Sequence, residues 1–283
     1  MSDDKKEYWR WDENNWKAPD KDWKDAKVIT AGVDVGSVSS QAVIMTDGEL
    51  YAYANMRTGY NSPQSATDVM NWALAASDGL KLDGIHFVVG TGYGRVKVPF
   101  SNKAITEIAC HARGGFAYVP KALTLVDIGG QDNEVVKIDD RGLRLDFKMN
   151  RKCAAGTGTF IEEIANRMNV PPESLDEMAR KAEKRFKIGS YCTVFASTEI
   201  LAQIRAGASA EELVRGIFES VVDRVMEMIP FEGLILLCGG VVEYHPFIAD
   251  LFKERISGEV IVPPHPQLTG AYGAALFARE SAG

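Results

Sequence analysis

An internal repeat is the feature of this sequence that most constrains its fold. The segment VITAGVDVG, which begins at Val28, is followed by QAVIMTDGE, and the same order returns in TLVDIGG followed by EVVKIDDRG. Asp34 and Val43 of the first copy lie 93 positions before Asp127 and Val136 of the second. This period is well beyond the roughly 20 to 50 residues of solenoid repeats. The repeat therefore predicts a duplicated strand–turn–strand unit and two similar lobes.

Helix signals between these strands make the predicted lobes α/β. ATDVMNWALAAS has apolar residues at helical spacing, GIHFVVGTG reads as a further strand, and KAITEIACHA reads as a helix. With 46% hydrophobic residues, the chain can bury a core in each lobe. We expect an N-terminal arm at 1–27, a first lobe at 28–120 completed by a terminal helix at 268–283, and a second lobe at 121–267, with a cleft between the lobes.

Each repeat ends its first strand in an aspartate that is followed by glycine. Glycine allows a tight turn there, so that backbone N–H groups and serine hydroxyls can approach phosphate oxygens. A single Asp-x-Gly is most often an ordinary turn, but two copies at matching places favour a phosphate site. A third glycine pair follows the apolar strand LILLC and is expected to pass close to a nucleoside. The candidate nucleotide ligands are Gly36, Ser37, Ser39, Ser40, Gly129, Gly130, Asp132, Gly239 and Gly240.

These glycine segments, together with TGAYGAA from Thr269, resemble the two phosphate motifs, the adenosine motif and the last connecting helix of the superfamily that includes actin, sugar kinases and heat-shock chaperones. The resemblance covers residues 28–279. It implies duplicated actin-like (ribonuclease H-like) lobes that bind ATP and Mg²⁺ in the cleft, with Asp34, Asp127 and Gln131 as catalytic residues. One departure is VVEYHP after Gly240, where relatives often carry an asparagine.

Two of the four cysteines stand just before predicted helices. Cys153 precedes FIEEIANRM and Cys192 precedes TEILAQIRAG, and a helix N-terminus lowers a thiol pKa and favours an anionic, thiolate-bound group. Cys110 and Cys238 are expected to be small buried hydrophobic residues. Because an iron–sulfur site usually takes four cysteines, a second chain would have to supply the other pair. Zinc is the alternative metal, although the sequence lacks the C-x₂-C spacing of zinc ribbons.

The pairing of DIGGQD at Asp127 with KCAAGTG at Lys152 resembles the family of ATP-dependent activators of 2-hydroxyacyl-CoA dehydratases and ATPase subunits of benzoyl-CoA reductase. The resemblance implies that Cys153 and Cys192 are the metal ligands of a [4Fe–4S] cluster shared with a partner subunit. ATP turnover would then drive a strongly reducing electron, supplied by ferredoxin, into a substrate-reducing partner. Asn133 and Glu134 depart from the family, in which a basic residue often follows GGQD.

The first 27 residues bear on the choice between the two branches of this family. They hold four of the five tryptophans, Trp9, Trp11, Trp16 and Trp23. Such rings either tuck onto their own domain or dock a partner subunit, because interfaces favour Trp. A docking arm suits a permanent subunit, so the sequence most resembles the short, D-type ATPase subunit of an ATP-dependent benzoyl-CoA reductase, paired with a second homologous ATPase subunit and with substrate-reducing subunits.

Three alternatives remain open. The first is a homodimeric activator of a 2-hydroxyacyl-CoA dehydratase. The second is a small-molecule kinase with Asp127 or Asp132 as its base, and the third is a filament-forming actin relative. The last two would need no iron.

Charge and hydropathy exclude other classes. The net charge of −7 argues against a nucleic-acid-binding surface, which depends on clustered Lys and Arg. No apolar run approaches the roughly 20 residues that span a bilayer, and the start of the chain lacks the apolar stretch of a signal peptide. We therefore expect a cytoplasmic protein whose cysteines are reduced thiols or metal ligands.

Overall fold

The computed structural model describes residues 11–150, 156–186, 188 and 193–283. Its contacts divide the chain into two compact units, each built from separate stretches of sequence. The N-terminal unit comprises 13–125, 136–147 and 267–283, and the middle unit comprises the described parts of 1–12, 126–135 and 148–266. The lobe boundaries expected after residues 27 and 120 stay predictions.

The N-terminal unit is built on a six-stranded sheet. The strand order is β1 (Asn14–Lys17), β4 (Glu49–Arg57), β3 (Ser39–Thr46), β2 (Ile29–Val35), β5 (Phe87–Thr91) and β6 (Lys103–Ala104). Strands β2, β3 and β4 form an antiparallel meander, and β5 pairs with β2 in parallel. The strands predicted at VITAGVDVG, QAVIMT and GIHFVVGTG are confirmed as β2, β3 and β5.

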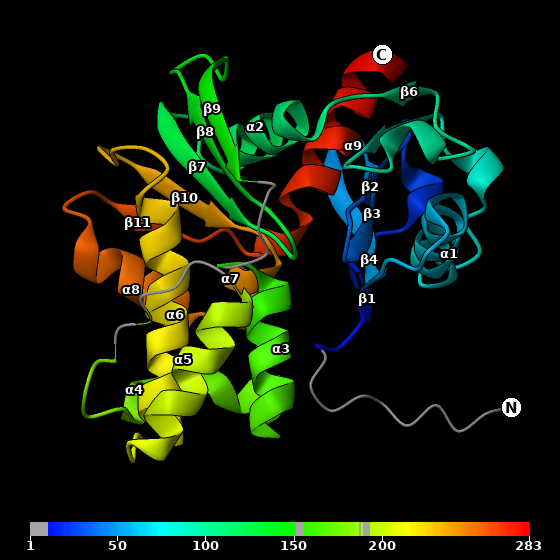
Figure 1. Cartoon of the computed structure of the whole chain (residues 1–283). Coiled ribbons are helices and arrows are strands. Elements are labelled where there is room, and N and C mark those ends of the chain that lie inside the picture. Colours follow the sequence, from blue (N-terminus) through cyan, green and yellow to red (C-terminus); the bar gives the residue numbers. More distant parts are fainter. Residues whose placement is uncertain (1–10, 151–155, 187, 189–192) are drawn as a thin grey trace, which may run out of the picture. The chain divides into compact units, whose positions relative to one another are not determined.

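Strand β2 is buried on both faces, because helices cover each side of the sheet (Figure 1). Ala31 and Val33 belong to the core that includes Val69 of α1 (Ser62–Ala75). On the other face lies α9 (Thr269–Ala282), and the Thr30 hydroxyl donates to the Ala275 carbonyl at 3.4 Å. A Cβ on Gly32 would lie 2.1 Å from the Ala271 carbonyl oxygen, so α9 can approach this closely only over glycine.

Helix α9 also packs on α2 (Glu107–Tyr118) through glycines on both helices. A Cβ on Gly114 would lie 2.2 Å from the Thr269 carbonyl oxygen, and one on Gly273 would lie 1.8 Å from that of Cys110. No side chain fits at either contact. The segment TGAYGAA therefore has small residues where the backbone of α9 lies against β2 and α2.

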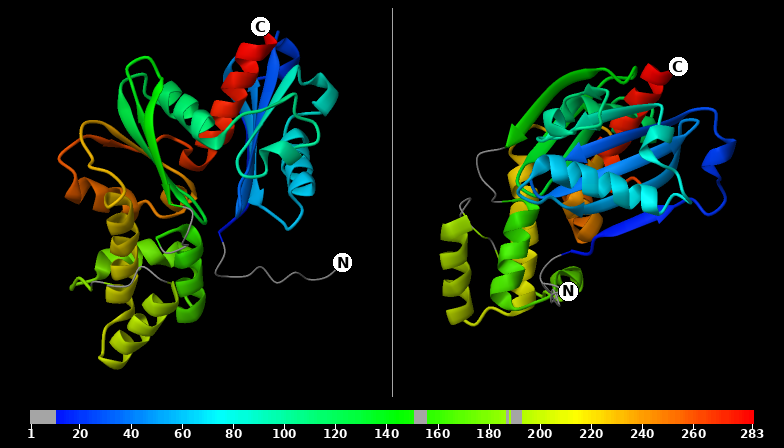
Figure 2. Two further views of the ribbon diagram at one scale, coloured as in Figure 1. Left: turned by 45° about the horizontal axis from the view of Figure 1, so that its top comes forward. Right: turned by 90° about the vertical axis from the view of Figure 1, so that its right-hand side faces the viewer.

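A five-stranded sheet follows the order β11 (Val260–Ile261), β10 (Ile235–Cys238), β7 (Leu123–Ile128), β8 (Asn133–Ile138) and β9 (Arg144–Asn150). In the middle unit, α3 (Gly158–Met168), α4 (Leu175–Lys181) and α5 (Thr193–Arg205) pack against the long helix α6 (Ala210–Met226), as Figure 2 shows for α3 and α5. The Ser209 and Glu212 side chains and backbone N–H groups form a capping box that fixes the start of α6. The remaining helices are α7 (Gly240–Tyr244) and α8 (Phe247–Arg255), with short 3₁₀ turns at Trp23–Asp25, Leu82–Gly84, Arg95–Lys97, Pro172–Ser174 and Pro266–Leu268.

Part of the expected N-terminal arm is an edge strand. β1 pairs antiparallel with β4, with Asn14 opposite Asn55, and Trp16 stacks on Tyr53 with ring centroids 5.7 Å apart. Trp23 packs against the core beneath the sheet. In the middle unit, Trp11 stacks on Tyr244. The described tryptophans of the arm thus rest on their own chain, while Trp9 lies outside the described residues.

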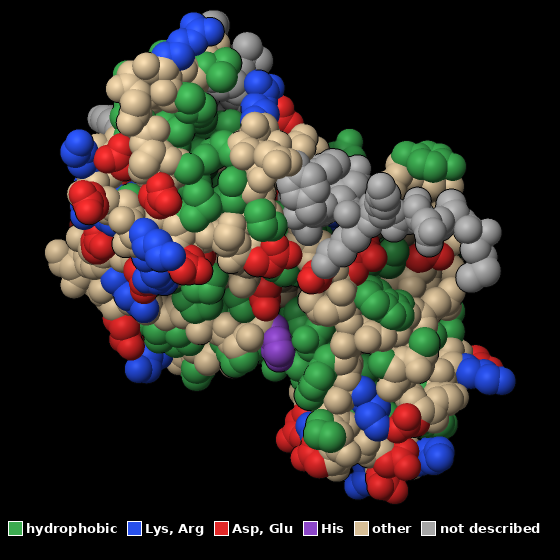
Figure 3. Space-filling view, turned by 90° about the horizontal axis from the view of Figure 1, so that it is seen from below, with side chains coloured by type: hydrophobic (Ala, Val, Ile, Leu, Met, Phe, Trp, Pro, Cys, Tyr) green, Lys and Arg blue, Asp and Glu red, His purple; other side chains and the backbone are tan. Residues whose placement is uncertain are grey.

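Acidic and basic side chains are interspersed on the face shown in Figure 3, and neither sign forms a continuous field there. Among the helices that the structure describes, none combines the length and apolar character needed to cross a membrane.

Candidate nucleotide site and cysteine segments

The first candidate phosphate loop is the turn between β2 and β3. The Gly36 N–H donates to the Ser39 carbonyl at 3.0 Å, and a Cβ on Gly36 would lie 2.8 Å from that oxygen. Asp34, at the end of β2, is only 8% exposed. A Cβ on Gly92 or on Gly270 would lie 2.2 Å from one of its two carboxylate oxygens. Two glycines thus make the space in which this carboxylate sits.

The second loop, between β7 and β8, repeats this geometry. The Gly129 N–H donates to the Asp132 carbonyl at 3.0 Å, and a Cβ on Gly129 would lie 2.9 Å from that oxygen. Asp127 is 8% exposed, as Asp34 is. The repeat seen in the sequence is therefore also a repeat of turn geometry, down to the hydrogen bond that closes each loop.

The third glycine pair lies against the second loop. Gly239 follows β10 with a φ of +96°, and a Cβ there would lie 2.5 Å from the Ile128 carbonyl oxygen and 2.8 Å from an Asp127 carboxylate oxygen. Its N–H donates to the Pro266 carbonyl at 3.0 Å. Both the backbone conformation and the close contact require glycine. The structure thus brings Asp127 and the expected nucleoside-contacting turn together, and Gly240 begins α7.

The predicted serine ligands differ in their surroundings. Ser37 is exposed and Ser39 is half-buried, whereas Ser40 is fully buried and its hydroxyl is 2.7 Å from that of Thr58. Ser37 and Ser39 are therefore the accessible hydroxyls of the first loop. Gln131 and Asp132 extend the second loop, with Gln131 exposed.

Four hydrogen bonds join the second loop to the start of α3. The N–H groups of Gly158 and Thr159 donate to the Gly129 and Gly130 carbonyls, each at 2.9 Å. The Thr159 hydroxyl also donates to the Gly130 carbonyl at 2.6 Å. The buried Asn133 side chain adds a bond from its Nδ2 to the Gly156 carbonyl at 2.9 Å. Loop and helix start are consequently a single hydrogen-bonded piece.

Sequence reasoning missed the roles of Asn133 and Thr159. Asn133 stood out only as a departure from the residue expected after GGQD, and Thr159 was not singled out. A polar residue that directly follows a phosphate turn and opens an apolar strand was the available signal, because a buried amide must find a partner.

Both predicted cluster ligands, Cys153 and Cys192, lie outside the described residues. The nearest described helices begin at Gly158, five residues after Cys153, and at Thr193, directly after Cys192. The expectation for the other two cysteines is confirmed, since Cys110 and Cys238 are fully buried free thiols. Burial raises the pKa of the Cys110 thiol to about 12. Cys238 donates to the Val126 carbonyl at 3.4 Å.

The described residues that flank the two cysteines are anchored on α6. After Cys153, Gly156 has a φ of +79°, and a Cβ there would lie 3.0 Å from the Arg224 side chain. Before Cys192, the Phe186 carbonyl packs on Gly216, where a Cβ would lie 2.5 Å from its oxygen. One helix thus supports both segments.

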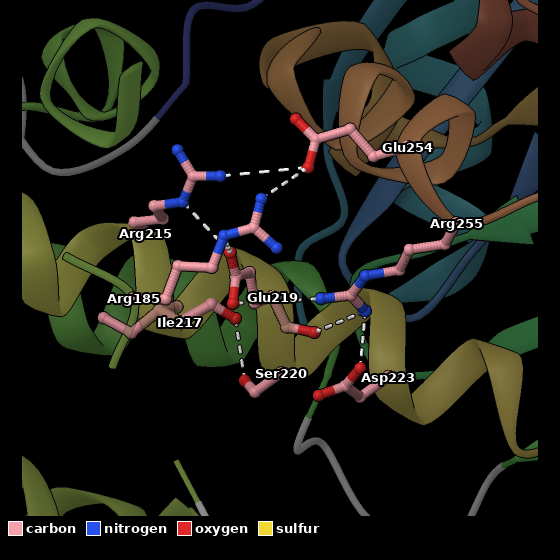
Figure 4. Close-up of polar contacts among 8 residues, drawn as sticks. All are labelled: Arg185, Arg215, Ile217, Glu219, Ser220, Asp223, Glu254 and Arg255. Atoms are coloured by element: carbon pink, nitrogen blue, oxygen red, sulfur yellow. Dashed lines mark hydrogen bonds and ion pairs between the residues drawn. The ribbon is translucent and has the colours of Figure 1, made fainter. Parts of the chain in front are cut away.

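An ionic cluster strengthens the second anchor (Figure 4). Arg185, Arg215 and Arg255 converge on Glu219 of α6, with the Arg215 Nε at 3.0 Å and the Arg185 Nε at 3.7 Å from its Oε1. The Arg185 Nη2 also lies 3.0 Å from Glu254 of α8. Because the Glu219 carboxylate is largely buried, loss of its partners would leave a poorly solvated charge.

Comparisons with known proteins agree with this architecture. The model of the BadF/BadG/BcrA/BcrD ATPase family matches residues 31–278. The activator of lactoyl-CoA dehydratase from Anaerotignum propionicum is 40% identical over 261 residues, covering 90% of this chain and 99% of that protein. A subunit of benzoyl-CoA reductase from Thauera aromatica, of the D type, is 28% identical, covering 88% of this chain and 92% of its own length.

Solved structures give the same result. The activator of 2-hydroxyisocaproyl-CoA dehydratase from Clostridium difficile, solved with bound ADPNP, superposes with a TM-score of 0.84 at 37% identity, over 90% of this chain and 96% of the other. Component A of (R)-2-hydroxyglutaryl-CoA dehydratase from Acidaminococcus fermentans gives 0.85 at 33%, over 90% and 99%. The predicted actin-like fold is confirmed. The expectation that the chain most resembles the D-type reductase subunit is not supported, because dehydratase activators match it more closely.

Proposed function

The chain belongs to the BadF/BadG/BcrA/BcrD ATPase family, and from this premise we propose that it is an ATP-hydrolysing activator that delivers electrons to a 2-hydroxyacyl-CoA dehydratase. Relatives named as dehydratase activators are 34 to 40% identical to it, whereas the benzoyl-CoA reductase subunit is 28% identical. The homodimeric alternative therefore replaces the reductase subunit as the favoured interpretation.

The arm no longer argues for a permanent reductase subunit. That argument needed the tryptophans of residues 1–27 to be available for a partner. Trp16 stacks on Tyr53 and Trp23 packs against the sheet core, so these two rings already have partners within the chain. An edge strand with supporting rings is equally compatible with a separate activator protein.

The observation that best supports an ATP-driven activator is the hydrogen-bonded connection between the second phosphate loop and α3. Gly129 and Gly130 are candidate phosphate ligands. Their carbonyls accept hydrogen bonds from Gly158 and Thr159, which lie five and six positions after Cys153. A loop that adjusts to the γ-phosphate would therefore act directly on the segment that follows this cysteine. An ordinary sugar kinase would have no need of such a connection.

Within the proposal, the two repeated loops serve one Mg²⁺-bound ATP. Asp34 and Asp127 position magnesium and water, Gln131 orients the attacking water, and glycine N–H groups with Ser37 and Ser39 bind phosphate oxygens. Gly239 and Gly240 lie beside the nucleoside. The matched turns and equal exposure of the two aspartates support this assignment.

Cys153 and Cys192 would hold a [4Fe–4S] cluster together with the same pair from a second copy of the chain. Two thiolates from each copy make the four that such a cluster takes. Cys110 and Cys238 do not suit the role, because each is fully buried and the pKa of Cys110 is raised to about 12, which keeps its thiol protonated. The cluster would supply a low-potential electron, with ferredoxin proposed as the donor.

Purification without oxygen, followed by two assays, tests the proposal. The protein is incubated with Mg²⁺-ATP, reduced ferredoxin and a 2-hydroxyacyl-CoA dehydratase component, and dehydration of lactoyl-CoA or 2-hydroxyisocaproyl-CoA is measured. A parallel reaction contains the substrate-reducing subunits of benzoyl-CoA reductase. We expect ATP-dependent dehydration and no reduction of benzoyl-CoA. ATP-dependent reduction of benzoyl-CoA without dehydration would return the assignment to the reductase.

Iron analysis of the same preparation tests the cluster separately. We expect about two irons per chain, because four are shared by two chains. Cys153→Ser and Cys192→Ser should each remove the iron, and Cys110→Ala serves as the matched control that retains it. Stoichiometric zinc in place of iron would contradict the cluster but leave the ATPase assignment intact.

A further inference from the structure

A closed ring of side-chain hydrogen bonds surrounds the hydroxyl of Ser39 in the first phosphate loop. Gln41 on β3 donates from Nε2 to the Ser39 Oγ and to the Asn55 Oδ1, each at 2.9 Å. Asn55 on β4 donates from Nδ2 to the Gln267 Oε1 at 2.7 Å. Gln267, in the turn before α9, donates from Nε2 back to the Ser39 Oγ at 3.2 Å. The ring therefore begins and ends at one hydroxyl.

Proton counting fixes the direction of these bonds. If the Gln41 amide were reversed, the contacts around the ring would reverse the amides of Asn55 and Gln267 as well. The Ser39 oxygen would then face two carbonyl oxygens with a single proton to share between them, which leaves one contact repulsive. Only the arrangement in which both glutamines donate to Ser39 satisfies every contact.

In that arrangement the Ser39 oxygen is already an acceptor twice. A hydroxyl has two lone pairs and one proton, so both lone pairs are used within the ring and the proton alone remains to be given away. Among the described residues, Ser39 makes no other side-chain hydrogen bond. Ser39 and Gln267 are half-buried, whereas Gln41 and Asn55 are only 4% and 3% exposed, so the hydroxyl lies on the accessible side of the network.

From this geometry we infer that Ser39 acts only as a hydrogen-bond donor, to a phosphate oxygen of the nucleotide, and is not a ligand of the magnesium ion. A metal ligand must offer a lone pair, and Ser39 has none left. Gln41 and Gln267 are the positioning residues that impose this polarity. The inference rests on the proposed ATP site and adds to it that the Ser39 hydroxyl donates its hydrogen bond there and does not accept one.

The backbone of Ser39 is held as firmly as its side chain. Its carbonyl accepts the Gly36 N–H that closes the phosphate loop. Gln267 stands three residues before Gly270, whose position against the Asp34 carboxylate was described above. The same short stretch before α9 therefore supports both the hydroxyl and the aspartate of the first loop.

A double-mutant cycle on ATP binding tests the inference. Affinities for ATP and for adenosine are measured by calorimetry for wild type, Ser39→Ala, Gln267→Glu and the double variant, each with Mg²⁺ and with EDTA. A carboxylate at 267 can only accept, so it would capture the Ser39 proton. A hydrogen bond to a charged group contributes about 1.5 to 3 kcal/mol, so Ser39→Ala should weaken ATP binding on the order of tenfold or more and leave adenosine binding unchanged.

Two results would support the donor role. The loss caused by Ser39→Ala should be equal with and without magnesium, and Gln267→Glu should cost at least about fivefold less in the Ser39→Ala background than in wild type. Equal losses in the two backgrounds, or a Ser39→Ala effect seen only with magnesium, would overturn the inference. Asn71→Asp makes the same amide-to-carboxylate change on the exposed side of α1 and should leave ATP affinity at the wild-type value.

Two further controls keep the outcomes separate. If Gln267→Glu lowers the thermal midpoint by more than about 5 °C, Gln267→Met replaces it in the same cycle, with a smaller expected loss. Wild-type protein that fails to bind ATP would contradict the proposed function itself, whereas ATP binding without coupling between positions 39 and 267 would contradict only the inference.

Discussion

At the scale of single residues, the two repeated aspartates are closely matched. Asp34 and Asp127 end equivalent strands, are equally exposed, and each has a glycine pressed against its carboxylate. Such confinement allows little relaxation when a carboxylate is replaced. The chemistry of either position can therefore be tested by an amide of the same size.

We expect Asp127→Asn to lower Mg²⁺-dependent ATP turnover at least tenfold, which corresponds to about 1.4 kcal/mol or more in the activation barrier. The amide keeps the shape that fits against Gly239 but loses the charge that is proposed to position magnesium and water. Steady-state phosphate release measures the effect. Asp140→Asn, at an exposed position of the β8–β9 turn, is the matched control. Wild-type turnover in Asp127→Asn would argue strongly against a catalytic second loop.

The buried cysteines give a prediction about pH. An ordinary thiol titrates near 8.5, so its labelling by iodoacetamide rises between pH 7 and 9. Burial raises the pKa of Cys110 to about 12, so its thiol stays protonated over that range. In a Cys153→Ser/Cys192→Ser variant, we expect no label on the native protein from pH 7 to 9 and two labels per chain in denaturant. Mass spectrometry counts them, and native labelling that grows with pH would refute the expected burial.

Residue identity could be predicted from the sequence where a local rule applied. The burial of Cys110 and Cys238 follows from their apolar surroundings, and Gly36 and Gly129 stand at the turns of a visible repeat. The side-chain hydrogen bonds of Asn133, Thr159 and Gln267 join positions that are 23, 29 and 212 residues apart, so no local sequence pattern predicts them.

At the scale of elements, the start of α3 is the feature that would make the second loop part of a switch under the proposed function. Its first residues are hydrogen-bonded to the loop by two backbone N–H groups and by the Thr159 hydroxyl. Backbone bonds survive mutation, so the hydroxyl is the part of the connection that can be removed.

We expect Thr159→Val to weaken the protection that nucleotide binding gives to residues 156–168 in hydrogen exchange by at least about threefold, because the side-chain bond to the loop is lost. Thr67→Val removes a comparable hydroxyl-to-carbonyl bond within α1, from Thr67 to Pro63, and should cost similar stability without changing that protection. Equal nucleotide-dependent protection in wild type and Thr159→Val would show that the hydroxyl carries no coupling.

The edge strand β1 gives a test at the same scale. Deletion of residues 1–10 leaves β1 and Trp23 in place and provides the reference protein. Deletion of 1–20 exposes the edge of β4 and removes Trp16 from Tyr53, which we expect to cost about 2 kcal/mol and roughly 4 to 8 °C. Scanning calorimetry compares the two proteins. Identical midpoints would mean that β1 adds nothing to the stability of the sheet.

Strands could be predicted from sequence where burial made them apolar, as in β2 and β3. β1 was missed because NNWK has neither alternation nor a β-branched residue, and its pairing depends on β4 being there to receive it. The helix expected at KAITEIACHA begins later, at Glu107, because Lys103 and Ala104 pair as β6.

At the scale of the whole molecule, the family was visible in the sequence but its branch was not. DIGGQD and KCAAGTG indicate the family, but they do not distinguish dehydratase activators from benzoyl-CoA reductase subunits. The choice between them rested on the arm, whose character depends on tertiary contacts that no motif encodes. Likewise, the assignment of 136–147 to the N-terminal unit follows from contacts across distant parts of the chain.

The return of α9 to the N-terminal unit has a consequence for synthesis. Until residues 269–282 leave the ribosome, the face of β2 that carries Thr30 and Gly32 has no helix to cover it, and α2 lacks the partner that Gly114 and Gly273 bring so close. The N-terminal unit therefore cannot finish folding until α9, the last helix to be translated, has been synthesised. We expect a chain that ends at residue 268 to be recovered in inclusion bodies, and to become soluble when residues 269–283 are expressed alongside it as a separate peptide.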